Sequence, residues 1–466
     1  MAAFTVQDIV RTTQGALVVG DLAIPVTGVG IDSRTLGVGE AFFAIKGHRL
    51  DGHEFLADAA SRGAACLVVH AVPEAIPAGV PLVLVEDTTR ALGRLAAAHR
   101  AKSDIPVVAI TGSNGKTTTA EMAAAVLAER WRVLKPEGSF NNQWGLPLTL
   151  LRLSPEHEAL VVELGTNQRG EIATLAALAA PTVGVVTTIA AVHTEFLGSL
   201  DGVRAEKAAL VRALPPTGCA VLNADDPRVA GMARDTQARV VTYGRAATAT
   251  VRAVGEIVEE AQGSGLRFTL EVAGQRQPLS LAFAGRHNVT NALAAAAAAV
   301  ALGFAPPEIA RGLQSARPAK GRCVWRRAGD VRILDDTYNA NPASVKAALE
   351  TAAASRGSGR LVVVLGDMLE LGDLAPEAHR EVGRHVAAAG VAELVGMGKL
   401  MQLTVEAARA AGVAEARHTT TFEDTVAYLL KRVVPGDLVL IKGSRGMRME
   451  RVADALSARL GRPDQR

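Results

Sequence analysis

The feature that most constrains the fold is a repeated alternation of short apolar runs, polar loops and alanine-rich stretches. From Ile105 onward, the apolar runs lie in the segments IPVVAITGSNGK, EALVVELGTN, PTVGVVTTIAAVHTE, GCAVLNADD and RVVTYG. Continuous runs of valine, isoleucine and leucine that alternate with helices are typical of a parallel sheet buried on both faces. The sequence therefore predicts an α/β fold with a central, mostly parallel sheet of the P-loop type.

The alternation falls into three blocks, and a length of 466 residues agrees with about three domains. Residues 1–100 carry short strand-like runs such as EAFFAIKG and ACLVVH, which indicate a smaller α/β domain. After NALAAAAAAVALG the pattern begins again with VRILDDTYNANP, LVVVLGDMLELG and LVLIKGSRG, which indicates a second, Rossmann-like doubly wound sheet. We predict domains at residues 1–100, 101–317 and 318–466.

Composition excludes several classes of function. A net charge of +3 and 3% aromatic residues provide neither a basic face nor a stacking platform for nucleic acid. Cys66, Cys219 and Cys323 form no CxxC pair, so we expect buried thiols in a reducing compartment. The apolar run from Ala292 is too short and too alanine-rich to span a bilayer, and the N-terminus has no secretion signal. We expect a soluble cytoplasmic protein with no nucleic-acid partner and no membrane span.

Polar side chains follow the predicted strands at the points where these strands end. The carboxyl ends of parallel strands meet at one edge of a sheet, where ligands bind in open α/β folds. Because both sheets carry such residues, the pattern predicts a site shared between two domains. The residues are Lys116, Glu163, His193, Asp225, Asp336, Asp367 and Lys442.

The segment TGSNGKTTT indicates a phosphate-binding loop. Gly112, Gly115, Lys116 and Thr117 match the G-K-[ST] end of a P-loop, whose backbone N–H groups and lysine hold phosphates. The full pattern fails because Ile110 stands where its first glycine belongs, so the loop is a shortened variant. An ordinary strand-to-helix turn would not need a lysine and three threonines, and the N-terminus of the helix favours the same anion.

Three further residues have both ordinary and functional interpretations. Glu163, at the end of the run EALVVELG, offers the hard oxygen that Mg²⁺ prefers, but a glutamate at a strand end also suits a helix cap or the surface. His193 has a structural interpretation of about equal weight. Lys207, in GVRAEKAALV, has the sequence context of a surface lysine on a helix.

Taken together, the motifs closely resemble the Mur ligase family over nearly the whole chain. TGSNGKTTT and HNVTNALAA are similar to segments that the whole family shares, whereas DDTYNANP, LGDMLELG and KGSR resemble the member that adds a dipeptide. The resemblance implies a monomeric, ATP- and Mg²⁺-dependent amide ligase of peptidoglycan precursor synthesis. Its substrates would be UDP-N-acetylmuramoyl-tripeptide and D-alanyl-D-alanine, which react through an acyl phosphate after the third domain closes.

The resemblance also implies roles for individual residues. Lys116, Glu163, His193 and Lys207 would form the catalytic group. Lys207 falls where the family has a carbamoylated lysine, and Thr117, Glu163, His193 and the modified Lys207 would hold metal. The residues implied for ATP are Gly112, Ser113, Asn114, Gly115, Lys116, Thr117, Thr118, Asn288, Asn291, Arg322 and Asp336. The residues implied for the substrates are Ser33 and Arg34 for the UDP-sugar, Asn141 and Asn142 for the muramoyl peptide, and Asn341, Lys442 and Arg445 for the dipeptide.

Three alternative functions have distinct sequence requirements. Another amide ligase of the superfamily, such as a folylpolyglutamate synthase or an earlier Mur enzyme, would not be expected to carry DDTYNANP together with the DSR segment at Asp32. A nucleotide-binding regulator without catalysis should have lost Lys116, Glu163 or Lys207. A P-loop kinase would not need a second sheet with its own charged strand ends.

Overall fold

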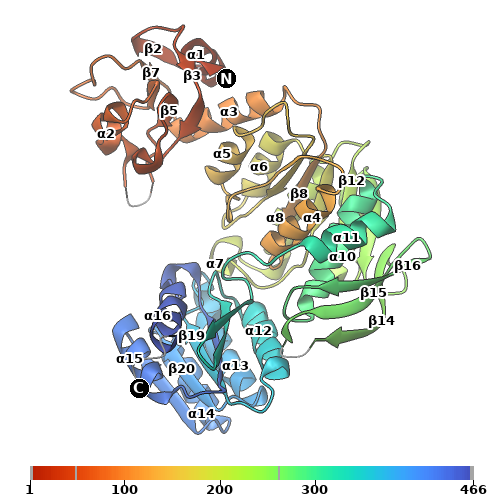
Figure 1. The fold of residues 1–466 in the computed structure, drawn as a ribbon. Coiled ribbons are helices and arrows are strands. Elements are labelled where there is room, and N and C mark those ends of the chain that lie inside the picture. Colours follow the sequence, from red (N-terminus) through yellow and green to blue (C-terminus); the bar gives the residue numbers. More distant parts are fainter. Residues whose placement is uncertain (1–3, 48–49, 261–262, 462–466) are drawn as a thin grey trace. The chain divides into compact units, whose positions relative to one another are not determined.

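The computed structural model describes residues 4–47, 50–260 and 263–461 (Figure 1). The chain divides into two compact units. The first unit comprises residues 1–109, 131–166 and 170–182, and the second comprises residues 110–130, 167–169 and 183–466. Strand β8 (Val107–Thr111) begins in the first unit and ends in the second.

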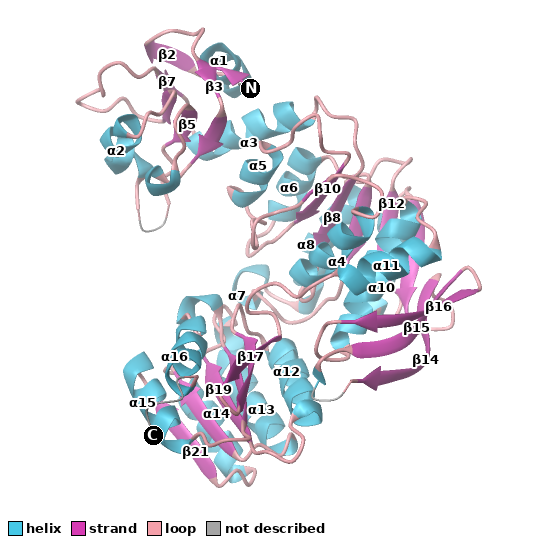
Figure 2. Ribbon diagram, viewed as in Figure 1, coloured by secondary structure: helices cyan, strands magenta, loops and turns pink. Residues whose placement is uncertain are grey.

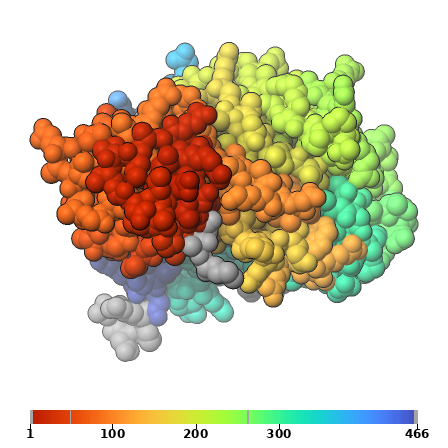
Figure 3. Space-filling view, turned by 90° about the horizontal axis from the view of Figure 1, so that it is seen from above, coloured from red at the N-terminus to blue at the C-terminus, as the bar shows by residue number. Residues whose placement is uncertain are grey.

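The N-terminal part of the first unit is built on a five-stranded sheet with the order β2-β7-β6-β5-β4. Its elements are β1 (Phe4–Thr5), α1 (Val6–Thr13), β2 (Ala16–Val19), β3 (Pro25–Val26), β4 (Gly28–Gly30), β5 (Glu40–Phe43), α2 (Leu56–Ser61), β6 (Cys66–Val69), β7 (Leu82–Leu84) and α3 (Thr88–Arg100). The runs EAFFAIKG and ACLVVH thus form β5 and β6, as predicted. In the space-filling view these residues, coloured red to orange, form one continuous body (Figure 3).

The rest of the first unit supplies the strand that ends at Glu163. Its elements are β9 (Val133–Leu134), α5 (Gly145–Leu150), β10 (Ala159–Glu163) and α6 (Glu171–Ala179). All five residues of β10 are buried, and β10 pairs with β9 in parallel. Helix α3 packs against α5 and α6, so this segment is continuous with the N-terminal part.

The second unit begins with the phosphate loop and the central strands, whose order is β16-β15-β14-β13-β12-β11. Its strands are β11 (Val183–Val186), β12 (Cys219–Asn223), β13 (Arg239–Gly244), β14 (Val251–Glu259), β15 (Leu266–Val272) and β16 (Gln275–Leu281). Its helices are α4 (Lys116–Leu127), α7 (Thr194–Leu197), α8 (Leu200–Arg212), α9 (Pro227–Ala230), α10 (His287–Ala301) and α11 (Pro306–Ser315). Strands β11 to β14 pair in parallel, and α4 packs against α10 and α11.

Strands β14, β15 and β16 pair in antiparallel fashion and extend the sheet, which the sequence analysis did not predict. Their residues alternate between buried and exposed positions, so they lack the continuous apolar runs of the parallel strands. Ala273 and Gly274 both have positive φ and join β15 to β16, where Val272 pairs with Gln275. A two-residue turn between alternating segments is the signal that indicates such a hairpin.

The C-terminal part of the second unit is a six-stranded sheet covered by helices on both faces (Figure 2). Its strands are β17 (Val324–Ala328), β18 (Val331–Asp336), β19 (Leu361–Gly366), β20 (Glu393–Met397), β21 (Glu415–Thr419) and β22 (Leu438–Lys442). Its helices are α12 (Pro342–Ser355), α13 (Ala375–Ala388), α14 (Met401–Ala410), α15 (Phe422–Arg432) and α16 (Glu450–Leu460). Helices α12, α13 and α14 pack on one face of the sheet and α15 and α16 on the other, which confirms the predicted doubly wound sheet.

The order β17-β18-β22-β19-β20-β21 places the last strand of the chain in the middle of this sheet. Strand β22 pairs in parallel with both β18 and β19. The register aligns Asp336 with Lys442, so the carboxyl ends of two neighbouring strands carry an acid and a base side by side. This is the position at which an open α/β sheet binds ligands.

The structure also bears on the predictions made for the cysteines and for membrane-spanning helices. Cys66, Cys219 and Cys323 are free and buried, as expected. Across residues 4–47, 50–260 and 263–461, no helix has the length and apolarity needed to cross a membrane.

Candidate functional site

Two glycines shape the loop between β8 and α4. Gly112 has φ 148°, and a Cβ at this position would lie 1.8 Å from Oγ1 of Thr187. Gly115 has φ 83° at the N-cap of α4, and its Cβ would lie 2.2 Å from Oδ1 of Asn291. Both the backbone conformation and the close approach therefore require glycine.

Hydrogen bonds to the segment after β11 hold the loop. The backbone N–H of Ser113 donates to the carbonyl oxygen of Thr188 at 2.8 Å, and the Ser113 hydroxyl exchanges hydrogen bonds with the backbone of Ala190. The Thr187 hydroxyl donates to the carbonyl oxygen of Asn114 at 2.5 Å. The loop is thus fixed by its neighbours at the N-terminus of α4, where the helix favours an anion.

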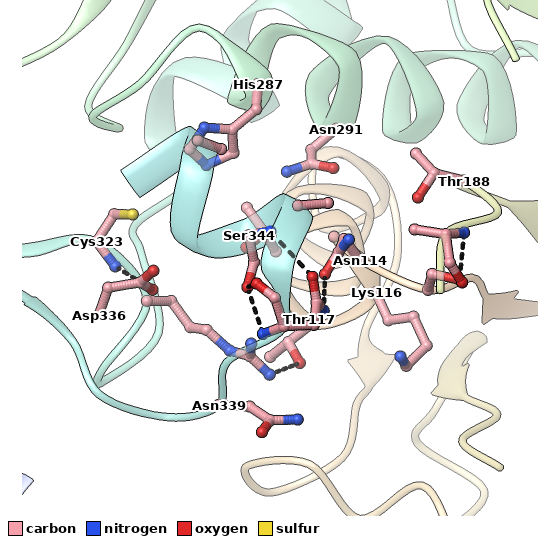
Figure 4. A pocket seen from close by; sticks show the side chains of 18 of the residues that line it. Asn114, Lys116, Thr117, Thr188, His287, Asn291, Cys323, Asp336, Asn339 and Ser344 are labelled. Atoms are coloured by element: carbon pink, nitrogen blue, oxygen red, sulfur yellow. Dashed lines mark hydrogen bonds between the residues drawn. The ribbon is translucent and has the colours of Figure 1, made fainter. Parts of the chain in front are cut away.

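The loop faces a cavity of about 380 Å³ within the second unit (Figure 4). Predicted residues that line it are Ser113, Asn114, Gly115, Lys116, Thr117, Thr118, Asn288, Asn291, Arg322, Asp336, Asn341 and Lys442. Lining residues that the sequence analysis missed include Thr188, His287, Cys323, Asn339 and Ser344. His287 and Cys323 are direct neighbours of the predicted Asn288 and Arg322, so their position beside a motif is the signal that indicates them.

Side chains of the C-terminal part reach the phosphate loop directly. Nδ2 of Asn341 donates to Oδ1 of Asn114 at 2.7 Å, and Nη2 of Arg322 donates to Oγ1 of Thr117 at 3.2 Å. Lys116 folds back over its own loop, where Nζ donates to the carbonyl oxygen of Gly112 at 2.9 Å. The cavity therefore collects a lysine, an arginine and a helix N-terminus around one space, as a phosphate chain requires.

The asparagines of α10 form a second group in the cavity. Nδ2 of Asn291 donates to Oδ1 of Asn288 at 2.8 Å, and Nδ2 of Asn288 donates to the carbonyl oxygen of Ala284 at 2.7 Å. Both asparagines are buried, and His287 precedes them on the same helix. His287 is exposed where it lines the cavity, and desolvation by the protein around it lowers its pKa.

A buried ion pair lies at the strand ends of the C-terminal sheet. Nζ of Lys442 lies 2.5 Å from Oδ2 of Asp336 and donates to the carbonyl oxygen of Asn339 at 2.8 Å. Oδ1 of Asp336 accepts the backbone N–H of Cys323 at 3.2 Å. Burial raises the pKa of the Cys323 thiol well above its usual value, so this cysteine is a poor nucleophile.

The surface interpretation of Lys207 is wrong, because this side chain is only 1% exposed. Burial, and then the charge of Lys116, lower the pKa of the Lys207 amine well below its usual value, while Glu206 acts in the opposite direction. Buried apolar residues of α8 flank Lys207 in the sequence. The location therefore favours an uncharged amine, which is the reactive form of lysine.

His193 connects the α7 segment to the C-terminal part. It caps α7 with φ 51°, and its Nδ1 lies 2.5 Å from Oε2 of Glu370, which also has positive φ. The hydrogen bond from His193 lowers the pKa of Glu370, against the effect of burial. The Thr194 hydroxyl donates to the carbonyl oxygen of Leu371 at 3.2 Å. Two hydrogen bonds therefore join the α7 segment to the segment of Glu370 and Leu371.

In the first unit, Glu163 and Asn141 lie close together. Glu163 is buried at the end of β10, and Nδ2 of Asn141 donates to one of its oxygens at 3.4 Å. Oδ1 of Asn142 accepts the backbone N–H groups of Trp144 and Gly145 at the start of α5. Asn142 therefore has a capping role whatever else it binds.

Ser33 and Arg34 form the first turn after β4. Ser33 is buried and hydrogen-bonds Asp58, which lowers the pKa of that carboxyl. Arg34 is exposed and makes two side-chain hydrogen bonds to Asp32. This turn therefore carries a buried hydroxyl beside an exposed guanidinium that Asp32 holds through two hydrogen bonds.

Two predicted strand-end acids have structural partners. Asp225 accepts the backbone N–H groups of Arg245 and Ala246. Asp367 accepts those of Leu400 and Met401 at the start of α14. Neither acid is among the residues that line the cavity, so each fixes the loop that follows a strand.

Three family models match the chain. Residues 25–100 match the model described as Mur ligase family, catalytic domain, and residues 110–299 match the Mur ligase middle domain. Residues 321–445 match the model described as Mur ligase, glutamate ligase domain.

Individual relatives match over nearly the full length. The UDP-N-acetylmuramoyl-tripeptide–D-alanyl-D-alanine ligase of Escherichia coli is 36% identical, and the match covers 98% of this chain and 99% of that protein. The crystal structure of MurF from Acinetobacter baumannii superimposes with a TM-score of 0.88 at 32% identity, over 98% of this chain and 99% of that one. MurF of Thermotoga maritima in complex with ADP has a TM-score of 0.78 at 26% identity, over 93% and 97% of the two chains.

Proposed function

Because the chain belongs to the Mur ligase family, we propose that it is an ATP-dependent amide ligase that joins D-alanyl-D-alanine to UDP-N-acetylmuramoyl-tripeptide. The observation that carries the proposal is the cavity of the second unit. There the phosphate loop, the α10 asparagines and the strand ends of the C-terminal sheet surround one space. The Thermotoga maritima relative was crystallised with ADP, which supports a nucleotide as its occupant.

The chemistry requires two steps because a carboxylate is a poor electrophile. The γ-phosphoryl group of ATP first moves to the terminal carboxylate of the tripeptide, which gives an acyl phosphate and ADP. The amine of D-alanyl-D-alanine then attacks the acyl carbon, and inorganic phosphate leaves with formation of the amide bond. Little covalent work falls to the protein in such a transfer, so positioning and charge provide the catalysis.

Residues of the cavity have separate tasks in this scheme. Lys116 and the N–H groups at the start of α4 hold the phosphates, and Lys116 stabilises the charge on the group in transfer. Asn288 and Asn291 bind the adenine side, while Arg322 contacts the phosphates and Asp336 the ribose. The contacts of Arg322 and Asn341 with the loop support a closed arrangement that excludes water from the acyl phosphate.

We propose that a magnesium ion accompanies the nucleotide. Mg²⁺ takes one or two carboxylates together with substrate phosphates and water, so it needs no cluster of protein ligands. Thr117 and Glu163 provide a buried hydroxyl and a buried carboxylate, and we assign them, with His193 and a carbamoylated Lys207, to the metal region. A bound ion would neutralise charge on the phosphates.

In this proposal, residues in all three domains bind the substrates. Ser33 and Arg34 bind the UDP-sugar, and Asn141 and Asn142 lie along the muramoyl peptide. Asn341, Lys442 and Arg445 serve the incoming dipeptide. The three proposed domains agree with this division, since each matched family range lies inside one of them. We also propose that the chain acts as a monomer in the cytoplasm, where ATP and the UDP-linked precursor are available.

The test measures phosphate release from ATP by the purified protein. We expect release only when both the UDP-tripeptide and D-alanyl-D-alanine are present. Lys116→Ala should lower the rate by about 10²–10³ without loss of the fold, since the lysine acts on charge in transfer. Lys431→Ala, which changes an exposed lysine in the last turn of α15, is the matched control and should retain the wild-type rate. Release without the dipeptide, or an unchanged rate in Lys116→Ala, would contradict the proposal.

A further inference from the structure

The ring of Tyr338 contacts two guanidinium groups. The Cζ atom of Arg322 lies 4.0 Å from the ring centroid, and that of Arg445 lies 5.5 Å from it. Both distances are within the range in which a cation is attracted to an aromatic face. Among the rings that the structure describes, only that of Tyr338 has two such cations.

Arg322 has donors available for an anion in the cavity. Its Nη2 donates to Oγ1 of Thr117 in the phosphate loop at 3.2 Å. Its Nε is buried and has no hydrogen-bond partner within the described part of the chain. Because a buried donor without an acceptor is costly, this orientation is favourable when an anion occupies the cavity.

The backbone at Tyr338 is fixed from two sides. The N–H of Tyr338 donates to the carbonyl oxygen of Gly321 at 3.1 Å, and Gly321 with φ 70° approaches the tyrosine closely. The buried carboxylate of Asp335 accepts both the N–H and the hydroxyl of Thr337, at 3.2 and 2.6 Å. The ring therefore stands on a rigid base, whereas both arginine side chains have many rotamers.

Arg445 reaches the ring from the segment that follows β22. Its backbone N–H donates to Oδ1 of Asn339 at 3.4 Å, and its Nη1 donates to Glu450 at 3.2 Å. The side chain is nevertheless 61% exposed, so most of its donors face solvent. Its location beside Tyr338 brings a second guanidinium group, which Glu450 pairs at one nitrogen, close to the arginine that contacts the phosphate loop.

We propose that Tyr338 is a positioning residue that holds Arg322 for the nucleotide phosphates and Arg445 for the carboxylate of the incoming dipeptide. The proposal rests on the proposed function, which supplies both anions. Two guanidinium groups repel each other, and the negative face of one ring offsets part of that repulsion. The loss of the ring therefore affects two substrates at once, although Tyr338 is not among the residues that line the cavity.

The experiment replaces the ring in the full-length protein. Tyr338→Phe keeps the ring, whereas Tyr338→Leu and Tyr338→Met remove it with side chains of different shape, in case one of them folds poorly. Calorimetry measures the Kd for ADP, and steady-state kinetics measure KM for each substrate. We expect the ringless variants to raise the Kd for ADP and the KM for D-alanyl-D-alanine by about threefold to thirtyfold each. The KM for the UDP-tripeptide should not change, and Tyr338→Phe should resemble the wild type.

A second tyrosine provides the matched control. Tyr428 on α15 is half-buried in the same sheet domain, and the Cζ atom of Arg417 lies 5.8 Å from its ring centroid, away from the cavity. Tyr428→Leu should destabilise the fold in thermal unfolding but leave the Kd for ADP and every KM unchanged. A double-mutant cycle completes the test, because Tyr338→Leu should weaken ADP binding no further in an Arg322→Ala background.

Four results separate this inference from the proposed function. Wild-type values of both constants in folded Tyr338→Leu would overturn the inference, and so would a Tyr338→Phe protein as impaired as the ringless variants. An undiminished effect of Tyr338→Leu in the Arg322→Ala background would also overturn it. ADP binding at wild-type affinity by Lys116→Ala would instead contradict the proposed function itself.

Discussion

At the scale of single residues, Lys207 has surroundings that differ from what its sequence context indicates. Lys207 lies in an alanine-rich helix with charged neighbours, and yet its amine is buried near the charge of Lys116. Burial of an amine without a carboxylate partner is costly, and an uncharged lysine avoids part of this cost. The same lysine can then react with CO₂, which an arginine cannot do.

We therefore predict that Lys207→Ala is nearly inactive and is partly rescued by acetate, which replaces the charge of a carbamate. Lys207→Arg should remain inactive because its cation persists at every accessible pH. Ligation rates normalised to folded protein give the measurement, and a ¹³C carbamate signal after incubation with labelled bicarbonate gives a readout independent of turnover. Arg212→Ala, at the exposed end of the same helix, serves as the control and should remain active. Full activity of Lys207→Arg would refute the carbamate.

At the scale of elements, helix caps contribute to stability and to the cavity at the same time. Asn341 caps α12 by accepting the N–H of Ser344 at 2.9 Å, and its amide also donates to Asn114 of the phosphate loop. Thr421 caps α15 by accepting the N–H of Asp424 at 3.1 Å, with no role in the cavity. The two caps therefore separate the effect of capping from the effect on the nucleotide.

We expect Asn341→Ala and Thr421→Ala each to lower the free energy of unfolding by about 1 kcal/mol. Only Asn341→Ala should also weaken ADP binding, by about threefold to tenfold, since it removes a hydrogen bond to the loop. Denaturant unfolding and calorimetry on the two proteins provide the comparison. Equal ADP affinity in both variants would show that the contact between Asn341 and Asn114 does not orient the loop.

The elements also show what a sequence can indicate. Continuous apolar runs identified β8, β10, β18, β19 and β22, because strands buried on both faces need apolar residues at every position. The same criterion missed β14 to β16, whose polar residues alternate with apolar ones. Motif residues such as Gly115 and Asn291 were predictable. The burial of Lys207 and the contact of His193 with Glu370 depend on packing between distant segments, so no local pattern reveals them.

At the scale of the whole molecule, buried histidines link stability to pH. Burial lowers the pKa of the half-buried His99 and of the fully buried His379 below the ordinary value of 6.5. His379 accepts the N–H of Met368 through Nε2 at 3.1 Å and pairs with the carbonyl oxygen of Ala375 through Nδ1 at 2.7 Å. The native state therefore favours the neutral imidazole, whereas histidines of the unfolded chain take up protons as the pH falls through 6.5.

In this pH range the unfolded state binds more protons than the native state, so stability rises with pH. The contribution is complete above pH 6.5 and is lost as the pH falls toward the lowered pKa values. We predict that the temperature of thermal unfolding is lower at pH 5.5 than at pH 7.5. His379→Gln, whose amide can supply one donor and one acceptor, should reduce the shift, whereas His385→Gln on the same helix should not. An unfolding temperature independent of pH across this range would contradict the prediction.

The central position of β22 has a consequence for the way the protein is made. Among the described residues this strand is the last along the chain, but it pairs with both β18 and β19 and carries Lys442 to the carboxylate of Asp336. During synthesis on a ribosome, both β18 and β19 emerge before the strand that lies between them in the sheet. The C-terminal sheet therefore cannot form in chain order, and the cavity lacks the wall that carries Lys442 until β22 has emerged. We therefore expect a chain interrupted before β22 to lack the pair of Lys442 with Asp336 in the wall of the cavity.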